Sequence, residues 1–243
     1  MTQSKSNICA PQGFAAAGIY SGICDRRVKL DLAMVVSRTD CSIVTAEASG
    51  ICQSQGRAVV YHNGLALPSG QRGNEIVAEA KSAVASSSHI PEDAISFLAS
   101  GQNGYFRPSL LVNSVSALTA GLSPYHASFV GTVLDCGSDV ASSEVKFHNG
   151  SGDYVMGGIL ADGVDGQPGI CFMTTDLAAT SDQLEEALQA CKATFDLADY
   201  KFIVMANGAA GSLGGKEGTH GLTQMMNSLL EQLGAEVTLK ICS

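Results

Sequence analysis

The sequence of 243 residues lacks any run of about 18 apolar residues, the length that a membrane-spanning helix requires. Residues 1–14 contain no apolar segment of the kind found in signal peptides. Basic residues are also few, with 14 Lys and Arg against 23 Asp and Glu and no basic stripe. A nucleic-acid partner needs such a stripe. We therefore expect a cytoplasmic protein with neither a membrane nor a nucleic-acid partner.

Motifs for metals and cofactors are absent as well. The eight cysteines form no C-x-x-C pair, and no two of the five histidines have a metal-ligand spacing. In this long, apolar chain we expect reduced thiols, most of them buried. Residues 208–219 are glycine-rich, but Glu217 stands where a phosphate-binding loop needs Ser or Thr, so a surface loop is the better interpretation. We expect no metal and no cofactor.

The composition, with 45% hydrophobic and 15% charged residues, is typical of a compact globular protein. Short β-branched runs bounded by turn residues alternate with helical patterns, which predicts an α/β fold of layered sheets and helices. No segment resembles an interdomain linker, so we expect one domain, residues 1–243. The predicted strands are 30–37, 57–62, 95–100, 128–134, 154–160, 170–175, 201–206 and 235–241.

Four segments carry the apolar periodicity of amphipathic helices. One begins near Asn74, and another spans 109–122. A third begins after Thr180, which forms a capping-box pattern with Gln183. The fourth spans 221–234, and Gly234 is expected to end it as the residue after the last helical turn.

One pair of residues has the chemistry of an oxyanion site. Ser100 and Gly101 follow a predicted strand, where a hydroxyl and a backbone N–H can both face a developing negative charge. An ordinary turn at the end of a strand explains the same residues. Residue types alone favour the turn.

Seven segments, taken together and in their order along the chain, form a recognisable set. They are "APQGFAAAGIYSGI" (10–23), "DLAMVVS" (31–37), "GRAVVYHNG" (56–64), "ASGQNG" (99–104), "GGILADG" (157–163), "FMTTD" (172–176) and "MANGAAG" (205–211). This set resembles the ornithine acetyltransferase family, the glutamate N-acetyltransferases of arginine biosynthesis, and its first and last segments are the most specific. The resemblance implies the α/β fold of that family, and it makes Ser100-Gly101 the counterpart of the family's Thr-Gly oxyanion pair.

The family implies a self-cleaving precursor whose new N-terminal threonine carries the acetyl group from N-acetylornithine to glutamate. This sequence departs from that pattern at four places. No threonine occupies the nucleophile position in "QPGICFMTTD" (167–176), and Asp162 before Gly163 replaces the family's lysine. An acidic, threonine-rich segment expected before residue 205 is missing, and so is the family's C-terminal part. By resemblance, Asp162 and Gly163 are candidate substrate-binding residues.

Cys171 is the nucleophilic residue that stands closest before Thr174-Thr175-Asp176. A cysteine can replace threonine as an N-terminal nucleophile, which makes Cys171 the candidate catalytic residue and predicts cleavage before it. On a strand its side chain can equally point into the core, and that interpretation is the favoured one.

Two functions remain open. The first is acyl transfer or amide hydrolysis on a small N-acylated amino acid, with a rebuilt site. The second is a non-catalytic relative that serves as scaffold, regulator or assembly subunit, because four departures are difficult to reconcile with the parental reaction. The family's oligomers make a homo-oligomer, or another assembly partner, the expected state.

Overall fold

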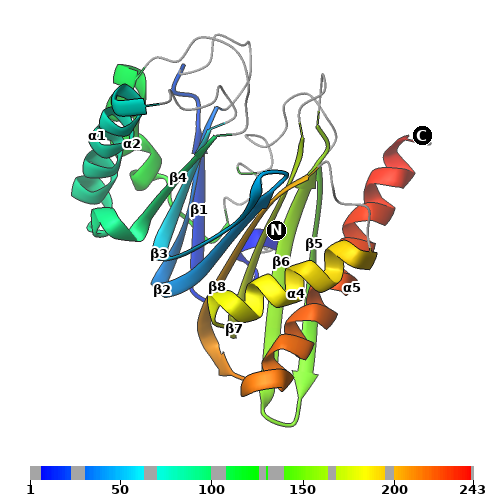
Figure 1. Cartoon of the computed structure of the whole chain (residues 1–243). Coiled ribbons are helices and arrows are strands. Elements are labelled where there is room, and N and C mark those ends of the chain that lie inside the picture. Colours follow the sequence, from blue (N-terminus) through cyan, green and yellow to red (C-terminus); the bar gives the residue numbers. More distant parts are fainter. Residues whose placement is uncertain are drawn as a thin grey trace.

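The computed structural model describes residues 7–22, 31–62, 70–99, 108–125, 130, 140–163, 168–194 and 200–241. In these residues, strands join into one hydrogen-bonded sheet in the order β4-β3-β2-β8-β7-β6-β5, and β1 pairs with β2 (Figure 1). The strands are β1 (Phe14–Ile19), β2 (Leu32–Glu47), β3 (Gly50–His62), β4 (Ile95–Ala99), β5 (Val140–Asn149), β6 (Gly152–Ala161), β7 (Gly169–Ala178) and β8 (Tyr200–Ser212). The helices are α1 (Gly70–Ser88), α2 (Pro108–Ala120), α4 (Ser181–Thr194) and α5 (Gly215–Ile241), with short 3-10 turns η1 (Asn7–Cys9) and η2 (Glu92–Ala94).

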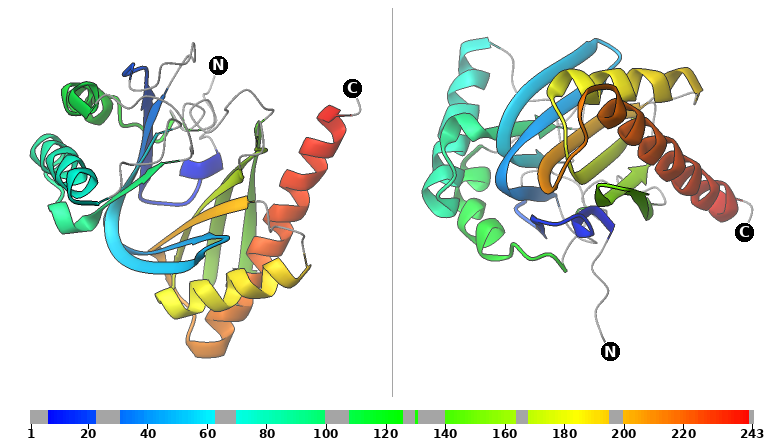
Figure 2. Two further views of the ribbon diagram at one scale, coloured as in Figure 1. Left: turned by 45° about the horizontal axis from the view of Figure 1, so that its top comes forward. Right: turned by 90° about the horizontal axis from the view of Figure 1, so that it is seen from below.

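Strand β2 belongs to both halves of the sheet. One of its edges pairs with β3 over almost its whole length. Its other edge pairs first with β1, from Leu32 to Ser37, and then with β8, from Ser42 to Ala46. An irregularity in the pairing with β3 separates the two parts, between Val36 and Cys41. Such irregularities bend a strand and increase its twist, and here the sheet folds so that its halves face each other (Figure 2).

The folded sheet and its helices make four layers. Helices α1 and α2 cover the outer face of the β1–β4 half, and α4 and α5 cover the outer face of the β5–β8 half (Figures 1 and 2). A third apolar cluster fills the space between the halves and includes Val35, Tyr61, Ile170 and Ile203. Because side chains alternate along a strand, each strand here has an inner face toward this cluster and an outer face toward the helices.

All four predicted helices are present, but α1 begins at Gly70 instead of near Asn74, and the last helix extends beyond its predicted bounds at both ends. Thr180 and Gln183 form the predicted capping box, with backbone-to-side-chain hydrogen bonds of 3.0 and 3.2 Å. Helix α5, however, does not end at Gly234, and residues 235–241, predicted as a strand, continue it. The strong apolar periodicity before Gly234 outweighs the β-branched residues after it, because extending a formed helix is favourable. Residues 208–219, interpreted as a loop, form the end of β8 and the start of α5.

Two strands were not predicted, and both have low β-propensity or high polarity. Strand β1 is rich in alanine, and β5, which pairs only with β6 in the described part of the sheet, carries polar residues at most positions. The predicted strand 128–134 lies outside the described residues, apart from Val130. The α/β prediction itself is confirmed.

The segments that carried the family resemblance meet around the N-terminal segment. Asp176 Oδ2 accepts a hydrogen bond from the Gln12 backbone N–H at 3.0 Å. Asn207 Nδ2 donates to the Gln12 carbonyl at 2.8 Å, and Thr174 Oγ1 donates to the Ile8 carbonyl. Gly13 has φ +85°, and a Cβ there would lie 2.9 Å from Asn207 Nδ2. Together these contacts hold the N-terminal segment across β7 and β8.

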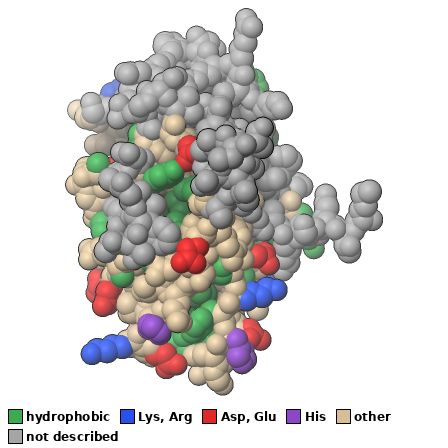
Figure 3. All heavy atoms as spheres, turned by 90° about the vertical axis from the view of Figure 1, so that its right-hand side faces the viewer, with side chains coloured by type: hydrophobic (Ala, Val, Ile, Leu, Met, Phe, Trp, Pro, Cys, Tyr) green, Lys and Arg blue, Asp and Glu red, His purple; other side chains and the backbone are tan. Residues whose placement is uncertain are grey.

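Charge on the surface agrees with the composition. On the face shown in Figure 3, the coloured Lys and Arg side chains stand apart from one another among Asp and Glu. None of the helices in the described part of the chain is long and apolar enough to cross a membrane.

We predict that Asp176→Asn destabilises the protein. Asp176 is fully buried and its second oxygen accepts the Val155 N–H at 2.8 Å, so an amide N–H₂ in its place leaves one buried donor facing another. The expected loss is about 1–3 kcal/mol in the free energy of unfolding, measured by urea denaturation. Asp153→Asn on the neighbouring strand β6, where the side chain is 85% exposed, is the matched control. Equal effects for the two variants would contradict the role assigned to Asp176.

We also predict that stability falls as the pH is lowered toward 4. His62 is fully buried, and burial lowers its pKa to about 4 although the charge of Asp31 opposes that shift. A histidine in the unfolded chain has a pKa of about 6.5, so between these two pKa values the unfolded chain binds a proton that the folded chain does not. The stabilisation present above pH ~6.5 is therefore lost on acidification, by on the order of 3 kcal/mol.

Urea denaturation at a series of pH values measures this effect. His62→Gln should flatten the dependence between pH ~6.5 and ~4, whereas His148→Gln, at a side chain that is 77% exposed, should leave it intact. An unchanged dependence in His62→Gln would show that other groups cause the acid loss.

Candidate functional site

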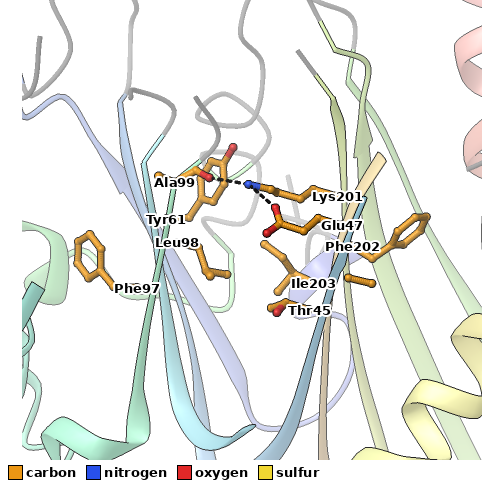
Figure 4. A pocket seen from close by; sticks show the side chains of 10 residues that line it. Thr45, Glu47, Tyr61, Phe97, Leu98, Ala99, Lys201, Phe202 and Ile203 are labelled. Carbon is orange, nitrogen blue, oxygen red and sulfur yellow. Dashed lines mark hydrogen bonds and ion pairs between the residues drawn. The ribbon is translucent and has the colours of Figure 1, made fainter. Parts of the chain in front are cut away.

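A pocket opens between the two halves of the sheet, at the end of β4 and the start of β8 (Figure 4). Its cavity volume is about 270 Å³, close to the lower limit for small-molecule sites. Strands β2, β3, β4 and β8 all contribute lining residues. They are Thr45, Ala46, Glu47, Tyr61, Phe97, Leu98, Ala99, Lys201, Phe202 and Ile203.

Lys201 joins three strands at this pocket. Its Nζ lies 3.0 Å from Glu47 Oε2 of β2 and donates to the Ala99 carbonyl of β4 at 3.2 Å (Figure 4). The antiparallel register pairs Ala46 with Phe202, so Glu47 and Lys201 are the next cross-strand pair. Alternation along β8 puts Lys201 on the same inner face as Ile203. The hydrogen bond from Lys201 is the main reason why the pKa of Glu47 is lowered.

The remaining wall of the pocket is mainly apolar. Tyr61 and Ile203 are each 1% exposed and belong to the cluster between the sheet halves, and Leu98 packs against it. An ammonium group at one end and apolar side chains at the other are suited to a small molecule with an anionic group and an apolar body. The ammonium group and the apolar wall of this pocket suit ligand binding. The residue paired with Lys201 on β7 is Ile170, whose side chain lies on the inner face and has no nucleophilic atom.

The candidate nucleophile Cys171 lies on the other face of the sheet. It follows Ile170 in β7, so its side chain enters the cluster beneath α4 and α5, where it is 0% exposed. Burial, and to a smaller extent Cys191, raise the pKa of the Cys171 thiol far above its ordinary value. Cys171 pairs with Leu160 of β6 on one side and with Phe202 of β8 on the other, so its backbone lies in the interior of the sheet. This is the core position that the sequence analysis favoured, and the geometry gives no support to a nucleophile.

The candidate residues Asp162 and Gly163 follow the end of β6. Asp162 Oδ1 accepts a hydrogen bond from the hydroxyl of Tyr200, which packs against the cluster under the helices. Tyr200 therefore holds Asp162 from the outer face, whereas Lys201 points to the inner one. Gly169 allows this arrangement, because a Cβ there would lie 2.4 Å from the Tyr200 ring. Gly163 is exposed.

The other candidates, Ser100 and Gly101, lie outside the described residues. Their predecessor Ala99 is described and its carbonyl accepts the hydrogen bond from Lys201. Within the described part of the chain, no group of three or more His, Cys, Asp or Glu side chains could hold a metal ion.

Lys201 and Glu47 are not among the site residues predicted from the sequence. A signal existed for Lys201, which directly precedes the apolar run 202–206, whereas Glu47 ends β2, a strand that carries several other polar residues. The sequence gives no indication that Lys201 contacts Glu47, since 154 positions separate them and the pairing of β2 with β8 is a tertiary feature.

Sequence comparison finds similarity to a curated plant protein, and no protein-family model matches the chain. The chloroplastic bifunctional arginine-biosynthesis protein ArgJ of Zea mays is 25% identical over 210 residues, which cover 77% of this chain and 45% of that protein. The chain therefore spans about half the length of the curated relative that it matches.

Structure comparison supports the fold over nearly the whole chain. The PH0078 protein of Pyrococcus horikoshii OT3 aligns with a TM-score of 0.55 at 9% identity, covering 95% of this chain and 85% of that one. A β-aminopeptidase of a Burkholderia species aligns with a TM-score of 0.54 at 11% identity, covering 96% and 86%. At these identities the likeness concerns the fold alone.

We predict that Cys171 resists alkylation in the native protein. A buried thiol with a raised pKa offers neither access nor thiolate, whereas Cys52 is exposed. Iodoacetamide at pH 8, followed by peptide mass mapping, should modify Cys52 and leave Cys171 unmodified until denaturant is added. Modification of native Cys171 as fast as that of Cys52 would contradict the placement.

Proposed function

We propose that this chain, a diverged relative of the ornithine acetyltransferase family, binds a small amino-acid-type molecule in the Lys201 pocket without the family's self-cleavage chemistry. One observation carries the proposal. The inner face of the sheet offers a charged, partly apolar pocket beside Lys201, and the residue expected to replace the nucleophile points to the opposite face.

The backbone around Cys171 supports the same conclusion. Self-cleavage before Cys171 requires attack on the Ile170 carbonyl, and both residues pair with β6 on one side and β8 on the other. Because the Cys171 side chain points under the helices, its attack would take place in the apolar core and on the opposite face from Lys201 and the pocket. In this proposal residues 1–243 form one domain that serves recognition.

The second candidate is acyl transfer or amide hydrolysis on an N-acylated amino acid. The similarity to ArgJ over 77% of the chain favours it. Its nucleophile would have to come from a residue other than Cys171, with Ser100 and Gly101 as the oxyanion pair. Under either function, a homo-oligomer or another assembly partner remains part of the proposal.

Two measurements on the purified protein separate these candidates. We expect one species near 25 kDa in a denaturing, reducing mass spectrum and no acetyl transfer from N-acetylornithine to glutamate. Cys171→Ala provides the control, because it should change neither result. Two fragments that separate before Cys171, or acetyl transfer by the wild-type protein whether or not Cys171→Ala abolishes it, would overturn the proposal and establish the enzyme.

A further inference from the structure

We propose that the pocket recognises its ligand through a carboxylate that replaces Glu47 as the ionic partner of Lys201. The inference rests on the proposed binding function and adds the chemistry of recognition. Glu47 then acts as an internal competitor: its carboxylate pairs with the Lys201 ammonium group when the pocket is empty, and a ligand carboxylate displaces it when the ligand binds.

The position of Lys201 fits this role. Its ammonium group has three N–H donors, and within the described residues its two acceptors are Glu47 Oε2 at 3.0 Å and the Ala99 carbonyl at 3.2 Å. The bond to Ala99 fixes the ammonium at the mouth of the pocket without neutralising it. The positive charge of Lys201 therefore remains available to a second anion, and the Ala99 carbonyl of β4 sets the position of the ammonium group.

Glu47 is the more easily displaced of the two partners. Its side chain is 50% exposed, against 26% for Lys201, and it ends β2 beside the turn that leads to β3. An exposed ion pair of this kind contributes little net stability, because water solvates the carboxylate well when the pair separates. A ligand carboxylate that also buries apolar surface against Tyr61, Leu98 and Ile203 can therefore take its place.

The same geometry selects against cationic ligands. A free amine entering the pocket would meet the Lys201 ammonium beside its apolar wall, and like charges disfavour this position. The ligand class is consequently a small carboxylate with a compact apolar body and no positive charge. Three probes with the same leucine side chain test this: N-acetyl-L-leucine, its amide N-acetyl-L-leucinamide, and L-leucinamide, which carries a free amine and no carboxylate.

Ligand-observed NMR titration against the intact protein measures the affinities. N-acetyl-L-leucine should bind, and the two amides should bind at least about tenfold more weakly, as expected for loss of a charge-assisted hydrogen bond. Lys201→Met should reduce the affinity for N-acetyl-L-leucine by about tenfold or more, and Lys201→Arg should retain most of it. Lys146→Met, at an exposed position on β5, controls for the loss of one positive charge.

Glu47→Gln gives the sharpest outcome, because removal of a competitor should raise the affinity for N-acetyl-L-leucine by about threefold. Glu231→Gln, at an exposed position on α5, controls for the change in net charge. Thermal unfolding followed by circular dichroism shows that each variant is folded, and Lys201→Arg and Glu47→Gln keep the test valid if Lys201→Met does not fold.

The outcomes separate the two proposals. If none of the three probes binds the wild-type protein, the proposed binding function is overturned with the inference. If N-acetyl-L-leucine and its amide bind equally well, or Glu47→Gln weakens binding, the pocket binds small molecules but the carboxylate exchange is wrong. Stronger binding of L-leucinamide would assign Glu47, instead of Lys201, as the recognition residue.

Discussion

The pairing of one edge of β2 with two successive partners is the constraint on which the rest of the structure depends. β1 takes the first part of that edge and β8 the second, with an irregularity between Val36 and Cys41. Because a single strand is shared, the two halves of the sheet cannot separate, and their inner faces bury a common cluster. The helices then have only the outer faces to cover, which gives the four layers.

The inner and outer faces decide which residues meet. Neighbouring residues of a strand point to opposite faces, so Ile170 and Lys201 share the inner face while Cys171 and Phe202 share the outer one. A difference of one position therefore separates a residue at the pocket from one in the core. For this reason a nucleophilic residue type near the expected place in the sequence is poor evidence for a nucleophile in the site.

The segments that resemble the ornithine acetyltransferase family contribute more to the framework of the fold than to the charged residues of the pocket. Gln12, Asp176 and Asn207 come from three of those segments. The Gln12 backbone N–H donates to Asp176 and its carbonyl accepts from Asn207, which holds the N-terminal segment across β7 and β8. Lys201 and Glu47, which define the pocket, come from none of them. Resemblance over most of the chain is thus compatible with a binding site of this chain's own kind.

The sequence by itself determined the α/β class, the helices with strong apolar periodicity and the capping box at Thr180, because each depends on residues that are near one another in the chain. It did not determine the edge strand β5, the continuation of α5 past Gly234 or the partnership of Lys201 with Glu47. These depend on strand pairing and burial between distant segments. Only the tertiary structure could decide which face each side chain occupies, and with it which residues form the site.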